Sequence, residues 1–283
     1  MITKRRPAGR IGIVACALAA LALSVTAPPE AAARHLPRVR VPTPERAPAR
    51  VLPFPSAPET LSETDDAPGV IAIPPLPRSA PRPVTVMLHG MCDEPENECP
   101  WFQSSVTRNS WLLCPRASLR CQGGGSIWSG KGFEETVERS VQRAKAEFPG
   151  TIDDAGGRTL VGFSLGAIRG MDLAHDGRGR YSGVILIGAK IFPNAERLRR
   201  AGVQRIVLAA GERDMMKWQM VGQAKRLARQ RFPVAFMSMG PVGHWFPRDM
   251  DQRLRRALDW VHGNDAAFVP NEPGELAWVP SGE

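Results

Sequence analysis

Short apolar segments alternate with amphipathic segments between residues 84 and 262, and this alternation constrains the fold most. The apolar segments are 84–88, 110–114, 159–163, 183–187, 205–210 and 234–239. Helical spacing of apolar residues marks 133–148, 165–174, 195–200, 216–231 and 248–261. Strands that are apolar throughout are typical of a parallel sheet buried on both faces. The sequence therefore predicts an α/β fold: one domain with a mostly parallel sheet and helices on both faces.

The N-terminus has the pattern of an export signal. Four basic residues precede an apolar run at 11–25, and Ala31, Ala32 and Ala33 follow it. The run is shorter than the ~20 residues that a membrane-spanning helix needs. We therefore expect residues 1–33 to be a signal peptide cleaved near Ala33, which gives a secreted or periplasmic protein. An uncleaved N-terminal membrane anchor is the alternative.

Composition sets the limits of the folded domain. Fifteen prolines lie between Pro28 and Pro83, and this part shows no sustained apolar period. Such a composition is typical of an extended spacer, so residues 34–83 are predicted to be a disordered linker. The α/β domain is expected over 84–262. The polar tail, 263–283, is expected to pack loosely or not at all.

Four cysteines lie close together in the domain: Cys92, Cys99, Cys114 and Cys121. An even, clustered set in an exported chain favours two disulfides. A zinc site is the alternative, but the spacing lacks the short C-x-x-C pairs of zinc ribbons. Three pairings are possible, and we expect the sequential one, Cys92 with Cys99 and Cys114 with Cys121.

The chain is basic, with a formal net charge of +9. Four of the positive charges lie in the signal, and the rest are spread over Arg-rich helix faces without the interleaved aromatic residues that stack on nucleic-acid bases. The pattern predicts a solvated basic surface and no nucleic-acid partner. It is compatible with weak association with an anionic envelope surface.

Polar residues follow the predicted strands at their carboxyl ends. Ser164 lies in a G-x-S-x-G motif where a strand gives way to a helix, Asp214 follows the strand 205–210, and His244 follows the strand 234–239. Glu212 is an alternative to Asp214. Carboxyl ends of parallel strands meet at one edge of the sheet. A serine hydroxyl needs a base to become a nucleophile, and that base needs a carboxylate to orient it, so these residues are candidates for one catalytic site.

With these motifs the chain resembles the α/β-hydrolase family over roughly residues 84–262. The resemblance implies a nucleophile, an acid and a base at Ser164, Asp214 and His244. It also implies an oxyanion hole formed by the backbone N–H groups of Leu165 and Met91, with no metal or organic cofactor. His89, which precedes this loop in the sequence, is expected to brace it rather than to act as the base.

The short connection between residues 187 and 195 leaves no room for a large cap domain, so we expect an open cleft. This resembles the compact esterases, whose substrates would be small-molecule or polymeric esters. Trp128 and Trp245 are candidate substrate contacts. Two other functions are compatible with the same sequence: a peptidase or amidase with the same triad, or a non-catalytic surface or binding protein. We expect a monomer.

Overall fold

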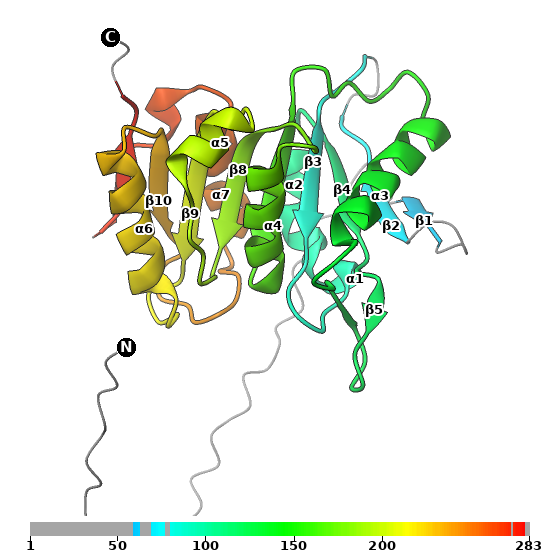
Figure 1. Cartoon of the computed structure of the whole chain (residues 1–283), viewed down its shortest axis with the longest axis horizontal. Helices are drawn as coiled ribbons and strands as arrows, with labels where there is room; N and C mark the ends of the chain where they lie inside the picture. The colour runs from blue at the N-terminus through cyan, green and yellow to red at the C-terminus, as the bar shows by residue number, and fades with distance from the viewer. Residues whose placement is uncertain (1–58, 63–68, 77–79, 273, 281–283) are drawn as a thin grey trace, which may run out of the picture. The chain divides into compact units, whose positions relative to one another are not determined.

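The computed structural model describes residues 59–62, 69–76, 80–272 and 274–280, all of which belong to one unit at 47–283. Their main feature is a nine-stranded sheet in the order β1-β2-β4-β3-β7-β8-β9-β10-β11 (Figure 1). The strands are β1 (Glu59–Leu61), β2 (Val70–Ile73), β3 (Val84–Leu88), β4 (Trp111–Pro115), β7 (Arg158–Phe163), β8 (Tyr181–Ile187), β9 (Arg205–Ala210), β10 (Val234–Ser238) and β11 (Leu276–Trp278).

The six central strands, β4 to β10 in the sheet order, are parallel, and the outer strands pair antiparallel. The prediction of a mostly parallel sheet is therefore confirmed. From β3 the chain first crosses to β4 on one side and then to β7 on the other. At such a reversal the connecting loops separate, and a crevice opens beyond the carboxyl ends of the strands.

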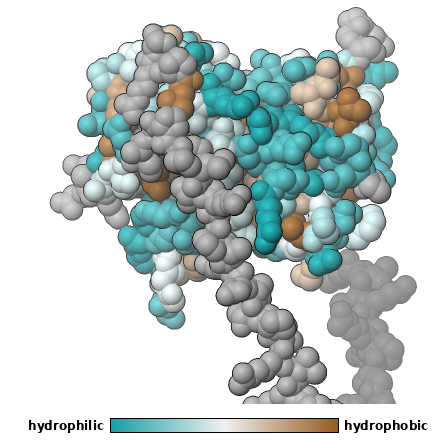
Figure 2. Space-filling model, turned by 180° about the vertical axis from the view of Figure 1, so that it is seen from behind, coloured by the Kyte–Doolittle hydropathy of each residue, from teal (hydrophilic) through white to brown (hydrophobic). Residues whose placement is uncertain are grey.

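Helices cover both faces of the sheet (Figure 1). They are α1 (Pro95–Glu98), α2 (Pro100–Val106), α3 (Phe133–Glu147), α4 (Leu165–Asp176), α5 (Ala195–Arg200), α6 (Lys217–Arg229) and α7 (Met250–Val261), with a 3-10 turn η1 (Asp265–Ala267). Helices α3 to α6 contribute apolar side chains to one buried cluster, and α2 and α7 to the other. The sheet thus separates two apolar cores. The outer surface seen from behind is largely hydrophilic where grey atoms do not cover it (Figure 2).

The folded domain is larger than the sequence predicted. Strands β1 and β2 lie inside the segment 34–83 that was expected to be a disordered linker, and all four residues of β2 are buried. The tail is also structured, because β11 pairs with β10 and Phe268 is buried. Both predictions were wrong for the described residues. The short edge strands β1 and β11 form because a partner strand is available, and their own sequence carries little pattern. Strand β2 is an inner strand, and its apolar run is only four residues long and is flanked by Pro68 and Pro74.

Two disulfides join Cys92 to Cys121 and Cys99 to Cys114. The expected disulfides are confirmed, but the sequential pairing was wrong, because the two bonds are nested. Cys92 is exposed and lies beside the small hairpin of β5 (Leu119–Arg120) and β6 (Ser126–Ile127), whereas Cys99 and Cys114 are fully buried. Cys92 and Cys99 therefore lie in different environments. With all four sulfurs in disulfide bonds, none is left as a zinc ligand.

The predicted signal peptide, 1–33, lies outside the described residues. Within the ranges that are described, no helix has the length and apolar character required to span a membrane.

Candidate active site

Ser164 lies in a sharp turn between β7 and α4. Its φ of 53° and ψ of −118° are unusual for a residue with a side chain, and such backbone strain is common at functional sites. The flanking glycines allow the close approach of strand and helix. A Cβ added to Gly162 would lie 2.5 Å from the Gly166 carbonyl oxygen, and one on Gly166 would lie 2.1 Å from the Leu88 carbonyl oxygen. The motif thus presents Ser164 beyond the end of β7.

The structure brings His244 and Asp214 to Ser164. His244 Nε2 is 2.9 Å from Ser164 Oγ, and His244 Nδ1 is 2.8 Å from Asp214 Oδ2. Asp214 is buried, and its Oδ1 accepts a 2.8 Å hydrogen bond from the Met216 N–H. Glu212, the alternative acid, is exposed and is not the partner of His244. Three side chains from three strand ends therefore form one continuous hydrogen-bonded row.

This row has a definite proton arrangement. An ionised Asp214 carboxylate can only accept, so His244 Nδ1 carries the hydrogen. In the neutral ring Nε2 is then free to accept the hydrogen of Ser164 Oγ. His244 is 46% exposed at its side chain while Asp214 is 4% exposed, so the base faces solvent and the acid is held in the protein. The arrangement can remove a proton from the serine hydroxyl as that hydroxyl attacks.

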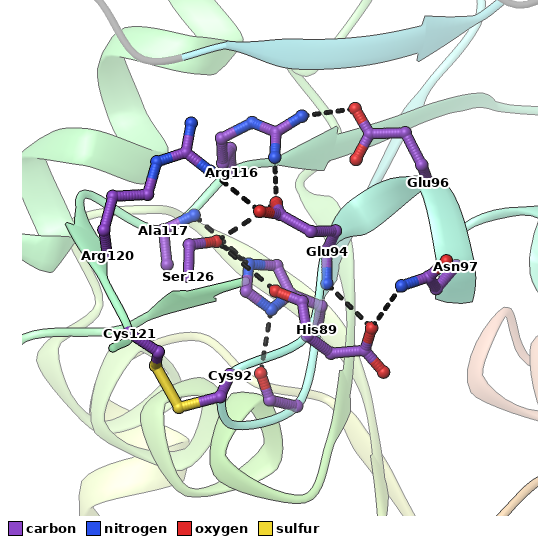
Figure 3. A network of polar contacts seen from close by, with 12 residues as sticks. His89, Cys92, Glu94, Glu96, Asn97, Arg116, Ala117, Arg120, Cys121 and Ser126 are labelled. Carbon is purple, nitrogen blue, oxygen red and sulfur yellow. Dashed lines mark hydrogen bonds and ion pairs between the residues drawn. A yellow bond between two sulfur atoms is a disulfide. The ribbon is translucent and has the colours of Figure 1, made fainter. Parts of the chain in front are cut away.

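His89 braces the loop after β3, as expected (Figure 3). Burial lowers the pKa of His89 to about 4, although its hydrogen bond to the Gly90 carbonyl acts in the opposite direction. The neutral ring donates from Nδ1 to the Gly90 carbonyl at 2.8 Å and accepts the Ala117 N–H at Nε2 at 3.2 Å. Because C=O and N–H of a trans peptide point in opposite directions, the Met91 N–H is directed away from the His89 ring.

Trp128 does not face a substrate. It is 2% exposed, and its Nε1–H donates a 2.9 Å hydrogen bond to the His89 carbonyl, so the prediction of a substrate contact was wrong for this residue. Its indole supports the loop that carries Met91. Trp245 is 36% exposed and its ring lies 5.9 Å from that of Phe163, which leaves it at the rim of the site. The sequence could not separate these two tryptophans, because neither spacing nor neighbours indicate burial.

Glu98 is a buried residue of the site that sequence reasoning missed. Its Oε1 accepts the Gly90 N–H at 2.9 Å, and this oxygen would lie 3.0 Å from a Cβ on Gly90. The Gly90 backbone is therefore held at its N–H by Glu98 and at its C=O by His89. Burial raises the pKa of Glu98 to about 8, although the hydrogen bond from Gly90 acts in the opposite direction, and Asp93 adds a smaller contribution that also raises it. One glutamate in an acidic loop carries no sequence signal of this role.

The raised pKa of Glu98 predicts a pH-dependent stability. From pH 4.5 to about 8 the folded chain keeps a proton that the unfolded chain releases, so the free energy of unfolding falls as pH rises through this range. Glu98→Gln removes this titration while keeping an acceptor for the Gly90 N–H. We expect the variant to gain a few kcal/mol relative to the wild type between pH 5 and pH 8, since one pKa unit corresponds to about 1.4 kcal/mol.

Denaturant unfolding at several pH values measures this difference. The control is Glu147→Gln, which removes a carboxylate from the exposed C-terminal end of α3. A constant difference between Glu98→Gln and the wild type across the range would contradict the shifted titration.

Ion pairs and a disulfide also hold the loop that follows β3 (Figure 3). The Glu94 carboxylate pairs with Arg116 and, at 2.8 Å, with Arg120 of the hairpin. The Cys92–Cys121 bond joins the residue after Met91 to the same hairpin. Thus the segment that follows β3 is tied to the segment that follows β4. Over the described ranges, no group of three or more His, Cys, Asp and Glu side chains is placed to hold a metal ion.

No protein-family model and no curated protein sequence matches the chain. Solved structures do match. The fluorophosphonate-binding serine hydrolase F of Staphylococcus aureus, with substrate bound, is 14% identical, with a TM-score of 0.55 over 74% of this chain and 99% of that chain. An S-formylglutathione hydrolase from Staphylococcus aureus has 14% identity and a TM-score of 0.54, over 73% of this chain and 98% of that one. A fungal esterase from Rhizomucor miehei has 13% identity and a TM-score of 0.53, with 75% and 83% covered. The architecture of this chain is therefore the α/β-hydrolase fold.

Proposed function

We propose that the protein is an exported serine hydrolase that cleaves carboxylic esters through an acyl-enzyme. The observation that carries this proposal is the hydrogen-bonded row of Ser164, His244 and Asp214, with Ser164 on a strained turn at the carboxyl end of β7. Support for export comes from two disulfides, which are typical of oxidising compartments. The proposed reaction needs no metal or organic cofactor, and the enzyme is expected to act as a monomer.

In the proposed reaction His244 Nε2 takes the proton of Ser164 as Oγ attacks the ester carbonyl carbon. The carbon–oxygen bond to the alcohol then breaks, and His244 returns the proton to the departing oxygen. Water, deprotonated in turn by His244, attacks the acyl group on Ser164 and releases the acid. Asp214 stays ionised and stabilises the imidazolium that forms in both halves.

The oxyanion of the tetrahedral intermediate would be bound by the N–H groups of Leu165 and Met91. Leu165 is the first residue of α4, and the first N–H groups of a helix have no partner within it. Support for Met91 comes from the Gly90 peptide, which His89 holds by its carbonyl. One such donor is worth about 3 kcal/mol of transition-state stabilisation.

A chromogenic short-chain ester tests the proposal directly. We expect the wild type to turn over the ester and to be labelled by a fluorophosphonate probe, and we expect both reactions to be lost in Ser164→Ala. Ser182→Ala, which removes a half-buried hydroxyl in β8, serves as the control and should retain both.

The same experiment separates the alternatives. Turnover that persists in Ser164→Ala would refute the assignment of the nucleophile. Labelling without ester turnover, together with cleavage of the matching amide, would show a peptidase or amidase. A wild type that is not labelled would be a non-catalytic protein on this fold.

A further inference from the structure

Exposed apolar side chains gather at the edge of the sheet that carries Ser164. We name four of them the apolar collar: Met91, Phe192, Met215 and Trp218, which are 63%, 60%, 85% and 77% exposed. Each follows the carboxyl end of a central strand, β3, β8 or β9, so all four are in loops or at a helix start on the side of the nucleophile. Large apolar side chains exposed together mark an interaction site.

Two segments of the collar start directly beside triad residues. Met215 directly follows Asp214 in the chain, and the loop to Phe192 starts at Gly188, where a Cβ would lie 3.1 Å from His244 Cε1. This loop is also tied to the start of α6, because the Ile191 N–H donates to Gln219 Oε1 at 3.4 Å. Phe192 and Trp218 therefore belong to two segments that are bonded to each other.

Cations lie among these side chains. Lys190 and Arg213 are exposed, Lys190 Nζ lies 5.9 Å from the Phe192 ring, and Lys217 Nζ lies 5.4 Å from the Trp218 ring. Glu212 is the exposed acid of these two segments, whereas Glu94 and Glu96 in the loop after Met91 are paired with Arg116. Around Phe192, Met215 and Trp218 the collar is thus apolar and positively charged. Aromatic rings with neighbouring lysines and arginines are typical of surfaces that meet a lipid headgroup region.

We infer that the apolar collar docks on an anionic lipid bilayer and that the enzyme takes its ester from that surface. The inference rests on the proposed function and names the substrate class, a lipid-borne ester. A neutral apolar polymer would contact Met215 and Trp218 but would leave the lysines without a partner, whereas an anionic bilayer complements both. The open, solvent-facing His244 lets a carbonyl approach from the bilayer without a lid moving.

Vesicle co-sedimentation of the purified protein tests the docking. Vesicles of phosphatidylcholine alone are compared with vesicles that also contain phosphatidylglycerol. We expect stronger binding to the anionic vesicles, weakened about tenfold by Trp218→Ser because a large apolar side chain is no longer buried. Lys217→Glu should weaken it by a similar factor, because it reverses one charge at the bilayer.

Two variants serve as matched controls. Arg229→Glu reverses a charge at the far end of the same helix, about 18 Å from Lys217 at 1.5 Å per residue, and should bind like the wild type. Val269→Ser removes an apolar side chain that is 67% exposed. Val269 follows η1 and does not belong to the loops at the carboxyl ends of β3, β8 and β9. Every variant shares residues 1–58, so differences between variants report on the described domain.

Soluble-ester turnover separates this inference from the proposed function. Turnover of a short-chain ester should be unchanged in Trp218→Ser and Lys217→Glu. Equal vesicle binding by these variants and the wild type would overturn the docking, as would equal losses in Lys217→Glu and Arg229→Glu. Equal binding to vesicles with and without phosphatidylglycerol would also overturn the docking. Absence of soluble-ester turnover in the wild type would instead refute the proposed function.

Discussion

Replacing Asp214 with asparagine is expected to lower kcat on a soluble ester by about 10⁴-fold. The asparagine keeps the shape and can still accept the Met216 N–H, so the free energy of unfolding should change little. Its amide hydrogens, however, can face His244 Nδ1, which then becomes an acceptor. Nε2 would carry the hydrogen and could no longer accept the proton of Ser164. Steady-state kinetics of the purified variant measure the effect.

The matched control is Glu212→Gln. Glu212 lies two residues away in the same loop and is exposed, so its replacement should change kcat by less than about twofold. Similar losses in the two variants would show that the loop tolerates no change, and similar activity would show that Asp214 is not the acid.

Gly166→Ala is expected to destabilise the fold and to reduce activity together. The added Cβ would lie 2.1 Å from the Leu88 carbonyl oxygen and 2.6 Å from that of His89. Both atoms are backbone, so no side chain can rotate away. Overpacking of this kind costs about 1–3 kcal/mol or more. The backbone that must move leads from β3 to Met91, so the expected loss of kcat exceeds what lower stability explains.

Gly222→Ala, at another glycine within a helix, is expected to raise the stability instead of lowering it. Gly222 lies inside α6, and a Cβ there meets nothing within 4 Å. Alanine is a better helix former than glycine, so this variant should gain about 0.5–1 kcal/mol with unchanged kcat. Denaturant unfolding of both variants tests the pair. A Gly166→Ala chain as stable as Gly222→Ala would contradict the close packing of α4 against β3.

The central strands were predictable because most of the residues in each are apolar. Residues 84–88, 205–210 and 234–239 had this property, and the strands found there match within one residue. Strands β1 and β11 have three residues each, which is too short for a period to show. Their structure depends on pairing with β2 and β10, whose edges exist only once the sheet has formed.

The candidate site also contains some residues that the sequence predicted and some that it did not. Ser164, Asp214 and His244 could be placed together because parallel strands end at one edge of a sheet, and that rule needs no knowledge of side-chain packing. Burial of Glu98 and Trp128 depends on how a loop folds over the sheet, and the local sequence carries no trace of it. Disulfide pairing failed for the same reason, since α1 separates Cys92 from Cys99 and α2 separates Cys99 from Cys114, and how these helices pack is not visible in the sequence.

The nested disulfides make oxidation cooperative. Cys99–Cys114 closes a span of 15 residues inside the span of 29 that Cys92–Cys121 closes. Once the inner bond has formed, the path between Cys92 and Cys121 runs through it and bypasses about half of the chain between them. The entropy lost on closing a loop grows with its length, so the inner bond makes the outer one easier to form. The two bonds thus favour each other, and the outer one ties the backbone next to Met91 to the hairpin.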